Sequence, residues 1–141
     1  MQRLLRILLL LAATGLAVPT AFAADATLNL DSNIPAGDAS FSDAVLWVRV
    51  WEYDPNLSDA GAKNVADTEV EECSHQMGAG SMFSATVLTE LKDGMSYYVT
   101  SEIFPNGEKK RGDRLYFTDG FNTVFTDGGD DDQQIELRSS K

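Results

Sequence analysis

Apolar and polar residues alternate with a period of two along most of the chain, which predicts β-strands. The clearest run is 44–53, AVLWVRVWEY, which is rich in β-branched and aromatic side chains. In a strand, Leu46, Val48 and Val50 share one aliphatic face that fits a core. The other face mixes aromatic residues with Arg49 and fits a half-covered outer surface. In a sandwich either face can be the inner one, so the tryptophans remain an alternative core.

Seven further runs have the same character and are separated by turn signals such as Asp93-Gly94. They cover residues 26–30, 68–75, 81–88, 95–104, 115–117, 122–126 and 134–138. The runs 115–117 and 122–126 flank Asp119-Gly120 and predict a hairpin. About eight short strands, with no helix long enough for a βαβ unit, predict an all-β fold. We expect a compact two-sheet antiparallel β-sandwich of about seven to eight strands.

Residues 1–23 have the pattern of a cleaved signal peptide. A basic start is followed by the apolar run 7–18, which is too short for the roughly 20 residues of a membrane span. The run ends in Ala21-x-Ala23, a cleavage-site pattern. We therefore expect a single domain over 24–141, located in the periplasm or secreted. The chain's one cysteine, Cys73, is far from this point, so neither a lipid anchor nor an internal disulfide is expected.

The chain is strongly acidic, with 22 acidic and 11 basic residues and a formal net charge of −11. Loss of Arg3 and Arg6 with the signal peptide leaves nine basic residues and a net charge of −13. Such a surface repels nucleic acid and anionic lipid, so we expect neither as a partner. One basic cluster, Lys109-Lys110-Arg111, is expected in a loop.

The pattern Glu69-x-Glu71-x-Cys73-x-His75-x-Met77 would place five metal-ligating side chains on one strand face. Thiolate, imidazole and thioether suit copper(I), whereas carboxylate and imidazole suit zinc. A blue-copper centre needs two histidines and the chain has one. We name Glu71, Cys73 and His75 as candidate metal ligands, with a buried cysteine beside a solvated strand face as the alternative. No other cofactor is expected.

Other chemistry has little basis in the sequence. The acidic run 127–132 could bind calcium but does not match EF-hand spacing, and an ordinary hairpin loop is the alternative. Ser74 and His75 would point to opposite faces of a strand, and no nucleophile-elbow glycine pattern is present. We therefore expect a protein that is not an enzyme. If the aromatic face of 44–53 is exposed, Trp47, Trp51 and Tyr53 are the candidate protein interface.

Three segments resemble the YbaY/YscW-like family of small exported bacterial proteins. They are Val45–Val50, the strand Tyr97-x-Val99-x-Ser101-x-Ile103, and RLYFTD at 114–119 followed by VFT-x-G at 124–128. The family comprises lipoproteins and a type III secretion pilotin, a protein that helps an outer-membrane secretin reach its place. The resemblance implies a compact β-sandwich, although this chain lacks the lipid-carrying cysteine.

Taken together, these features predict an exported, non-catalytic binding or accessory protein of the bacterial cell envelope with an envelope protein as partner. The alternative is a periplasmic metal-binding protein that uses the Cys73 and His75 strand face.

Overall fold

The computed structural model describes residues 24–37, 39–106 and 109–141 as an all-β protein. Its elements are β1 Ala24–Ile34, β2 Phe41–Tyr53, β3 Lys63–His75, β4 Ser81–Leu91, β5 Ser96–Pro105, the 3-10 turn η1 Arg111–Asp113, β6 Tyr116–Thr118, β7 Asn122–Val124 and β8 Asp131–Ser139. Within these residues no helix has the length and apolar character needed to cross a membrane. The expected signal peptide, 1–23, lies outside the described residues.

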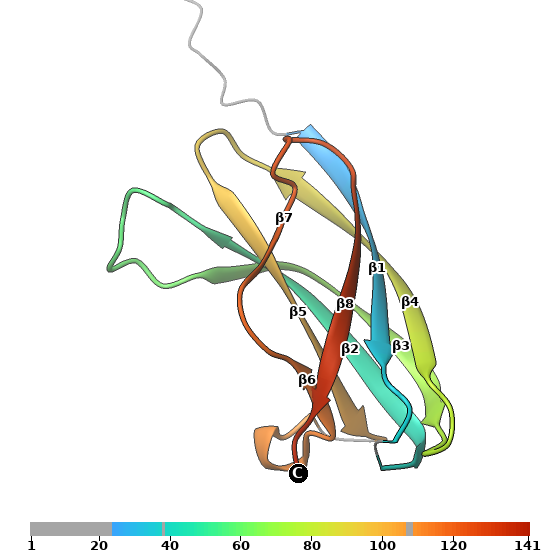
Figure 1. Cartoon of the computed structure of the whole chain (residues 1–141). Helices are drawn as coiled ribbons and strands as arrows, with labels where there is room; N and C mark the ends of the chain where they lie inside the picture. Colours follow the sequence, from blue (N-terminus) through green and yellow to red (C-terminus); the bar gives the residue numbers. More distant parts are fainter. Residues whose placement is uncertain (1–23, 38, 107–108) are drawn as a thin grey trace, which may run out of the picture.

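The eight strands form one continuous sheet in the order β3-β2-β5-β6-β8-β1-β4, with β7 also paired to β5. Strand β8 joins the two halves of the sheet. It runs parallel to β1 over 131–136 and antiparallel to β6 over 137–139. The sheet curls into a nearly closed, barrel-like shape (Figure 1). The all-β prediction is confirmed. The expected two-sheet sandwich is not confirmed, because β8 pairs with β1 through 131–136 and with β6 through 137–139 and so joins all strands into one sheet.

The core lies inside the curled sheet and uses the aliphatic face of β2. Leu46, Val48 and Val50 are completely buried. They pack in one cluster with the inward-facing residues of the other strands, among them Leu28, Leu30, Val99, Ile103 and Leu137. The aliphatic face is therefore the inner one, and the tryptophans of β2 lie outside the core.

One polar pair crosses this core. Ser32 on β1 and Ser101 on β5 are both fully buried, and their hydroxyl oxygens lie 2.8 Å apart. The two strands are not neighbours in the sheet. The hydrogen bond therefore links opposite walls of the barrel and satisfies both buried hydroxyls.

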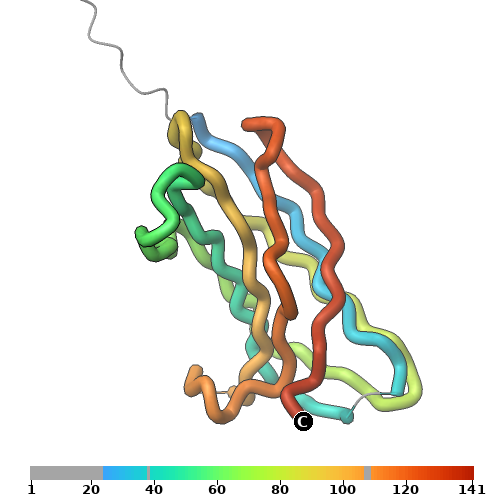
Figure 2. The backbone as a smooth tube through the Cα atoms, turned by 60° about the vertical axis from the view of Figure 1, so that its left-hand side comes forward, coloured from blue at the N-terminus to red at the C-terminus, as the bar shows by residue number. Residues whose placement is uncertain are grey.

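Strands β6 and β7 do not form the expected hairpin. Both pair antiparallel with β5, β6 at Glu102 and Ile103 and β7 at 97–99. Since β2 occupies the other edge of β5, β6 and β7 lie in line along one edge (Figure 2). At the end of β6 the Thr118 hydroxyl accepts a hydrogen bond from the Ser101 N–H at 2.6 Å and donates one to the Ser101 carbonyl at 2.8 Å. Strands β6 and β7 are thus two parts of one interrupted strand, with Asp119-Gly120 in a bulge between them.

Candidate functional site

The outward faces of β2 and β5 bring together aromatic and charged side chains. Trp47, Arg49 and Trp51 occupy alternate positions of β2 and are all partly exposed. Their direct partners on β5 are Glu102, Thr100 and Tyr98 respectively. We call this surface, with the neighbouring Tyr53, Phe104, Lys109, Arg111, Arg114 and Phe121, the outer face.

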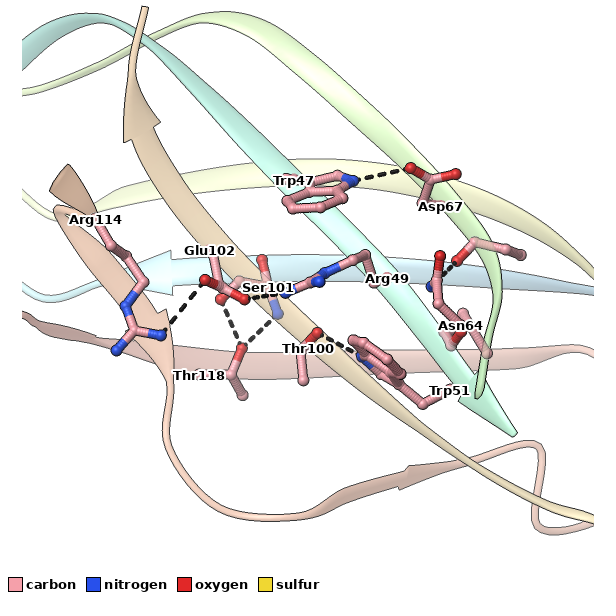
Figure 3. A network of polar contacts seen from close by, with 12 residues as sticks. Trp47, Arg49, Trp51, Asn64, Asp67, Thr100, Ser101, Glu102, Arg114 and Thr118 are labelled. Atoms are coloured by element: carbon pink, nitrogen blue, oxygen red, sulfur yellow. Dashed lines mark hydrogen bonds and ion pairs between the residues drawn. The ribbon is translucent and has the colours of Figure 1, made fainter. Parts of the chain in front are cut away.

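Arg49 lies between the two tryptophans of β2. Its guanidinium carbon is 4.0 Å from the ring centroid of Trp47 and 4.8 Å from that of Trp51. Both indoles are held by hydrogen bonds, because Trp47 Nε1 donates to Asp67 Oδ2 and Trp51 Nε1 donates to Thr100 Oγ1, each at 2.9 Å (Figure 3). A cation over an indole is stabilised by about 0.5–2 kcal/mol. The arginine is therefore fixed in place before any ligand arrives.

Glu102 is the carboxylate at the centre of this network. Its Oε1 accepts a hydrogen bond from Arg49 Nη2, and its Oε2 lies 3.4 Å from Arg114 Nη1 (Figure 3). The Glu102 side chain is 11% exposed. The Nε atoms of Arg49 and Arg114 are buried and have no hydrogen-bond partner among the described residues. One carboxylate therefore serves two guanidinium groups and leaves part of their donor capacity unused.

A shallow pocket of about 410 Å³ opens beside this network. It is lined by four cationic residues, one acid and two aromatic residues, namely Arg49, Lys109, Arg111, Arg114, Glu102, Trp47 and Phe104. Lys109 pairs with Glu69, and its Nζ lies 4.7 Å from the Trp47 centroid. Arg111 is exposed and forms no ion pair with the described residues. Positive charge thus exceeds negative charge in this pocket.

Aromatic side chains extend the outer face toward the far end of β2. Phe121, in the bulge between β6 and β7, has its ring centroid 4.6 Å from that of Tyr98 and 5.3 Å from that of Tyr53. Tyr98 in turn stacks on Trp51, with ring centroids 6.1 Å apart. Phe121 remains 58% exposed. An aromatic surface therefore continues beyond the two tryptophans.

The sequence identified part of this site. Trp47, Trp51 and Tyr53 lie on the outer face, where exposed interface residues were expected. Glu102 and Arg114 were not identified, because their place depends on which strands pair. The alternation of β5 could have identified Glu102, because this residue lies between the core positions Ser101 and Ile103 and therefore points outward.

Glu71 does not share a strand face with Cys73 and His75, so the expectation of one common face for the three candidate metal ligands was wrong. Between Val70, opposite Leu46, and Cys73, opposite Ala44, β3 contains one residue more than β2. This β-bulge, at which Glu72 has φ 58°, reverses the alternation of the strand. As a result of this bulge, Glu71 is exposed, whereas Cys73 and His75 are buried.

Cys73 and His75 are separately accommodated in the core. The Cys73 thiol donates to the Val70 carbonyl at 3.3 Å, and burial raises the pKa of this thiol. His75 Nδ1 lies 2.7 Å from Ser81 Oγ, and the imidazole packs near Phe41 and Tyr116. The described residues contain no group of three or more His, Cys, Asp or Glu side chains arranged to hold a metal ion. This arrangement gives the metal hypothesis no support.

The acidic run 127–132 fastens the β7–β8 connection to its neighbours. Asp130 Oδ1 accepts a hydrogen bond from the Thr27 N–H at 2.8 Å, and Asp132 Oδ1 accepts one from Asn29 Nδ2 at 2.8 Å. Asp131 Oδ2 accepts from the Phe125 N–H at 2.9 Å. These carboxylates therefore have hydrogen-bonding roles within the fold.

Comparison with known proteins gives a likeness to a solved structure. No family model matches the chain, and no curated protein matches it either. Among solved structures it is similar to an alternative pilotin from the type II secretion system of Vibrio cholerae, with a TM-score of 0.56 and 18% identity. The match covers 82% of this chain and 98% of that chain. At this identity the likeness shows a shared fold, and membership of the YbaY/YscW-like family stays a prediction.

Proposed function

We propose that this chain is a non-catalytic accessory protein of the bacterial cell envelope that works, as a pilotin-like protein, by binding another protein through its outer face. The fold that it shares with a secretion-system pilotin and the signal peptide expected at 1–23 support this assignment. The observation that carries it is the outer face itself, a partly exposed surface of aromatic and arginine side chains outside a separate core.

The composition of the outer face favours protein binding. Tryptophan, tyrosine, phenylalanine and arginine are enriched at interfaces and dominate their binding energy. The inner cluster does not contain Trp47, Trp51, Tyr53 or Phe121, so the fold does not need these four side chains as core. A large exposed aromatic residue such as Phe121 is therefore better explained by a partner than by folding.

The reactive side chains favour binding over catalysis. His75 and Cys73 are each 2% exposed, and His75 is hydrogen-bonded to Ser81 within an aromatic cluster. Glu102 has both carboxylate oxygens engaged by arginines. None of these groups stands ready to accept a proton from a substrate or to attack one.

Position-specific photo-crosslinking in the native envelope tests the proposal. A benzophenone amino acid replaces Phe121 on the outer face in one variant and Leu88 on β4 in the other. The two side chains are matched controls because both are apolar and similarly exposed, at 58% and 64%, while β4 carries none of the outer-face residues. We expect a discrete crosslinked envelope protein from position 121 and none from position 88. Equal products from both positions, or none from position 121, would contradict the proposal.

A further inference from the structure

We propose that the pocket of the outer face receives an acidic segment of the partner protein, with carboxylates at the arginines and an apolar side chain against Trp47. This inference rests on the proposed function and specifies the chemistry of the partner. It commits to a protein segment, and small anions are outcomes of the test.

The distribution of charge is the first observation that supports an acidic partner segment. Beyond residue 23 the chain has nine basic residues, and four of them line this one pocket. Glu102 and Glu69 offset part of this charge, whereas Arg111 has no ion-pair partner among the described residues. A positive cleft in an otherwise acidic protein focuses its field locally. The acidic remainder repels extended polyanions, so a short acidic segment fits better than nucleic acid or an anionic membrane.

The geometry of the arginines carries the second step. Arg49 is held by two indoles, and Arg114 has its guanidinium carbon 4.1 Å from the centroid of the Phe117 ring. Guanidinium groups that are already ordered lose little conformational entropy when they bind, and their planar donors match carboxylates. The unpartnered Nε atoms show that Glu102 alone does not saturate these donors.

The aromatic lining carries the third step. Trp47 and Phe104 border the same pocket, with ring centroids 6.3 Å apart. An acidic segment with an aromatic or aliphatic side chain beside its carboxylates would bury that side chain here while its charges meet the arginines. Both apolar burial and charge complementarity then contribute to recognition.

Intrinsic fluorescence gives a direct readout, because both tryptophans of the chain, Trp47 and Trp51, lie on the outer face. The probes are two blocked peptides without tryptophan, GDFEDLEG and its amide counterpart GNFQNLQG, titrated into the mature protein. We expect the acidic peptide to give a saturable change and the amide peptide to bind at least about ten-fold more weakly, or about 1.4 kcal/mol.

Two variants locate the binding. Arg111→Ala should weaken binding of the acidic peptide by about five-fold or more, since Arg111 is exposed and forms no ion pair with the described residues. Lys63→Ala removes one positive charge at the start of β3, outside the pocket, and should change the affinity by less than about two-fold. Urea unfolding of both variants checks that they remain folded.

Several results would overturn this inference. They are no response to about 1 mM acidic peptide, equal binding of the amide peptide, or no effect of Arg111→Ala. Displacement of the acidic peptide by sodium phosphate, but not by sodium chloride of equal ionic strength, would assign the pocket to small anions and would also overturn it. If the crosslink from position 121 persists in Arg111→Ala, the inference of an acidic partner segment is wrong, while the proposed function stands. Peptide binding without a position-specific crosslink would count against the proposed function instead.

Discussion

Glu102 illustrates how one side chain organises a surface at the residue scale. Its carboxylate bridges Arg49 and Arg114 and is 11% exposed. We predict that Glu102→Gln lowers the free energy of unfolding by about 1–3 kcal/mol, because two guanidinium groups lose their counter-charge in a partly desolvated site. Urea denaturation of the purified variant measures this loss.

The exposed pair between Arg138 and Asp119 provides the control for this prediction. Their side chains are 69% and 51% exposed. Asp119→Asn should therefore cost less than about 1 kcal/mol. Equal losses for the two variants would show that the Glu102 network is no more than an ordinary surface ion pair.

Cys73 provides a second prediction at the residue scale. Burial raises the pKa of its thiol in the folded state, so the folded protein holds this proton more tightly than the unfolded chain does. The stabilisation that results from this difference is fully present below the pKa of the thiol in the unfolded chain, about 8.5. It is lost as pH rises through the pKa of the thiol in the folded protein. We expect the free energy of unfolding to fall as pH rises above about 8.5, and to fall less steeply in Cys73→Ala.

Tyr97 contributes in the same direction, because desolvation is the main cause that raises its pKa. The alkaline decline should therefore persist in part when the thiol is removed. If Cys73→Ala and the parent protein show the same slope, the thiol does not contribute to the decline.

The same residues show where sequence patterns reach their limit. Alternation correctly assigned Leu46, Val48 and Val50 to the core, because buried and partly exposed positions of β2 alternate without a break from Ala44 to Tyr53. It failed between Glu71 and Cys73, because one additional residue reverses the parity of β3. The bulge is formed by Glu72 at a positive φ, where glycine or asparagine would have given a signal.

Strands β6 and β7 show the same limit at the scale of elements. Asp119-Gly120 between two short apolar runs has the composition of a hairpin turn. A turn signal is local, however, whereas pairing depends on the partner strand. Because β5 is ten residues long and β6 and β7 have three each, both short strands pair along β5. Eight strands were expected from the sequence, but their order was not, because β8 bridges β1 and β6 through residues far apart in the chain.

The interrupted strand leads to a prediction about Thr118. Its hydroxyl replaces a backbone partner for both the N–H and the carbonyl of Ser101. Thr118→Val keeps the shape of the side chain but leaves these groups unpaired, so it should cost about 1–3 kcal/mol of unfolding free energy.

Two substitutions isolate this contribution. Thr118→Ser retains the hydroxyl and should recover most of the stability. Thr123→Val, at an exposed position of β7, should change it by less than about 0.5 kcal/mol. Comparable losses in Thr118→Val and Thr123→Val would refute the assigned role of the hydroxyl.

At the scale of the whole molecule, the core and the outer face are separate. The interior is one cluster of buried, mainly aliphatic residues, and the outer face combines aromatic residues with cations in a strongly acidic chain. The sequence indicated the aromatic half of this surface through Trp47, Trp51 and Tyr53. The cationic half could not be predicted from the sequence. Arg49 on β2, Arg114 after η1 and Lys109 come together only when β2, β5 and the segment following β5 are assembled.

The central claim is that this outer face serves a partner and not the stability of the fold. The measurement that tests it most directly is crosslinking from position 121 in a Trp47→Ala background, with urea unfolding of the same protein. We predict a loss of about 1–2 kcal/mol of stability, well below the 2–5 kcal/mol typical of a core change such as Leu46→Ala. We also predict that the crosslinked product falls at least about ten-fold. A fully retained crosslink, or a stability loss as large as that of Leu46→Ala, would contradict the claim.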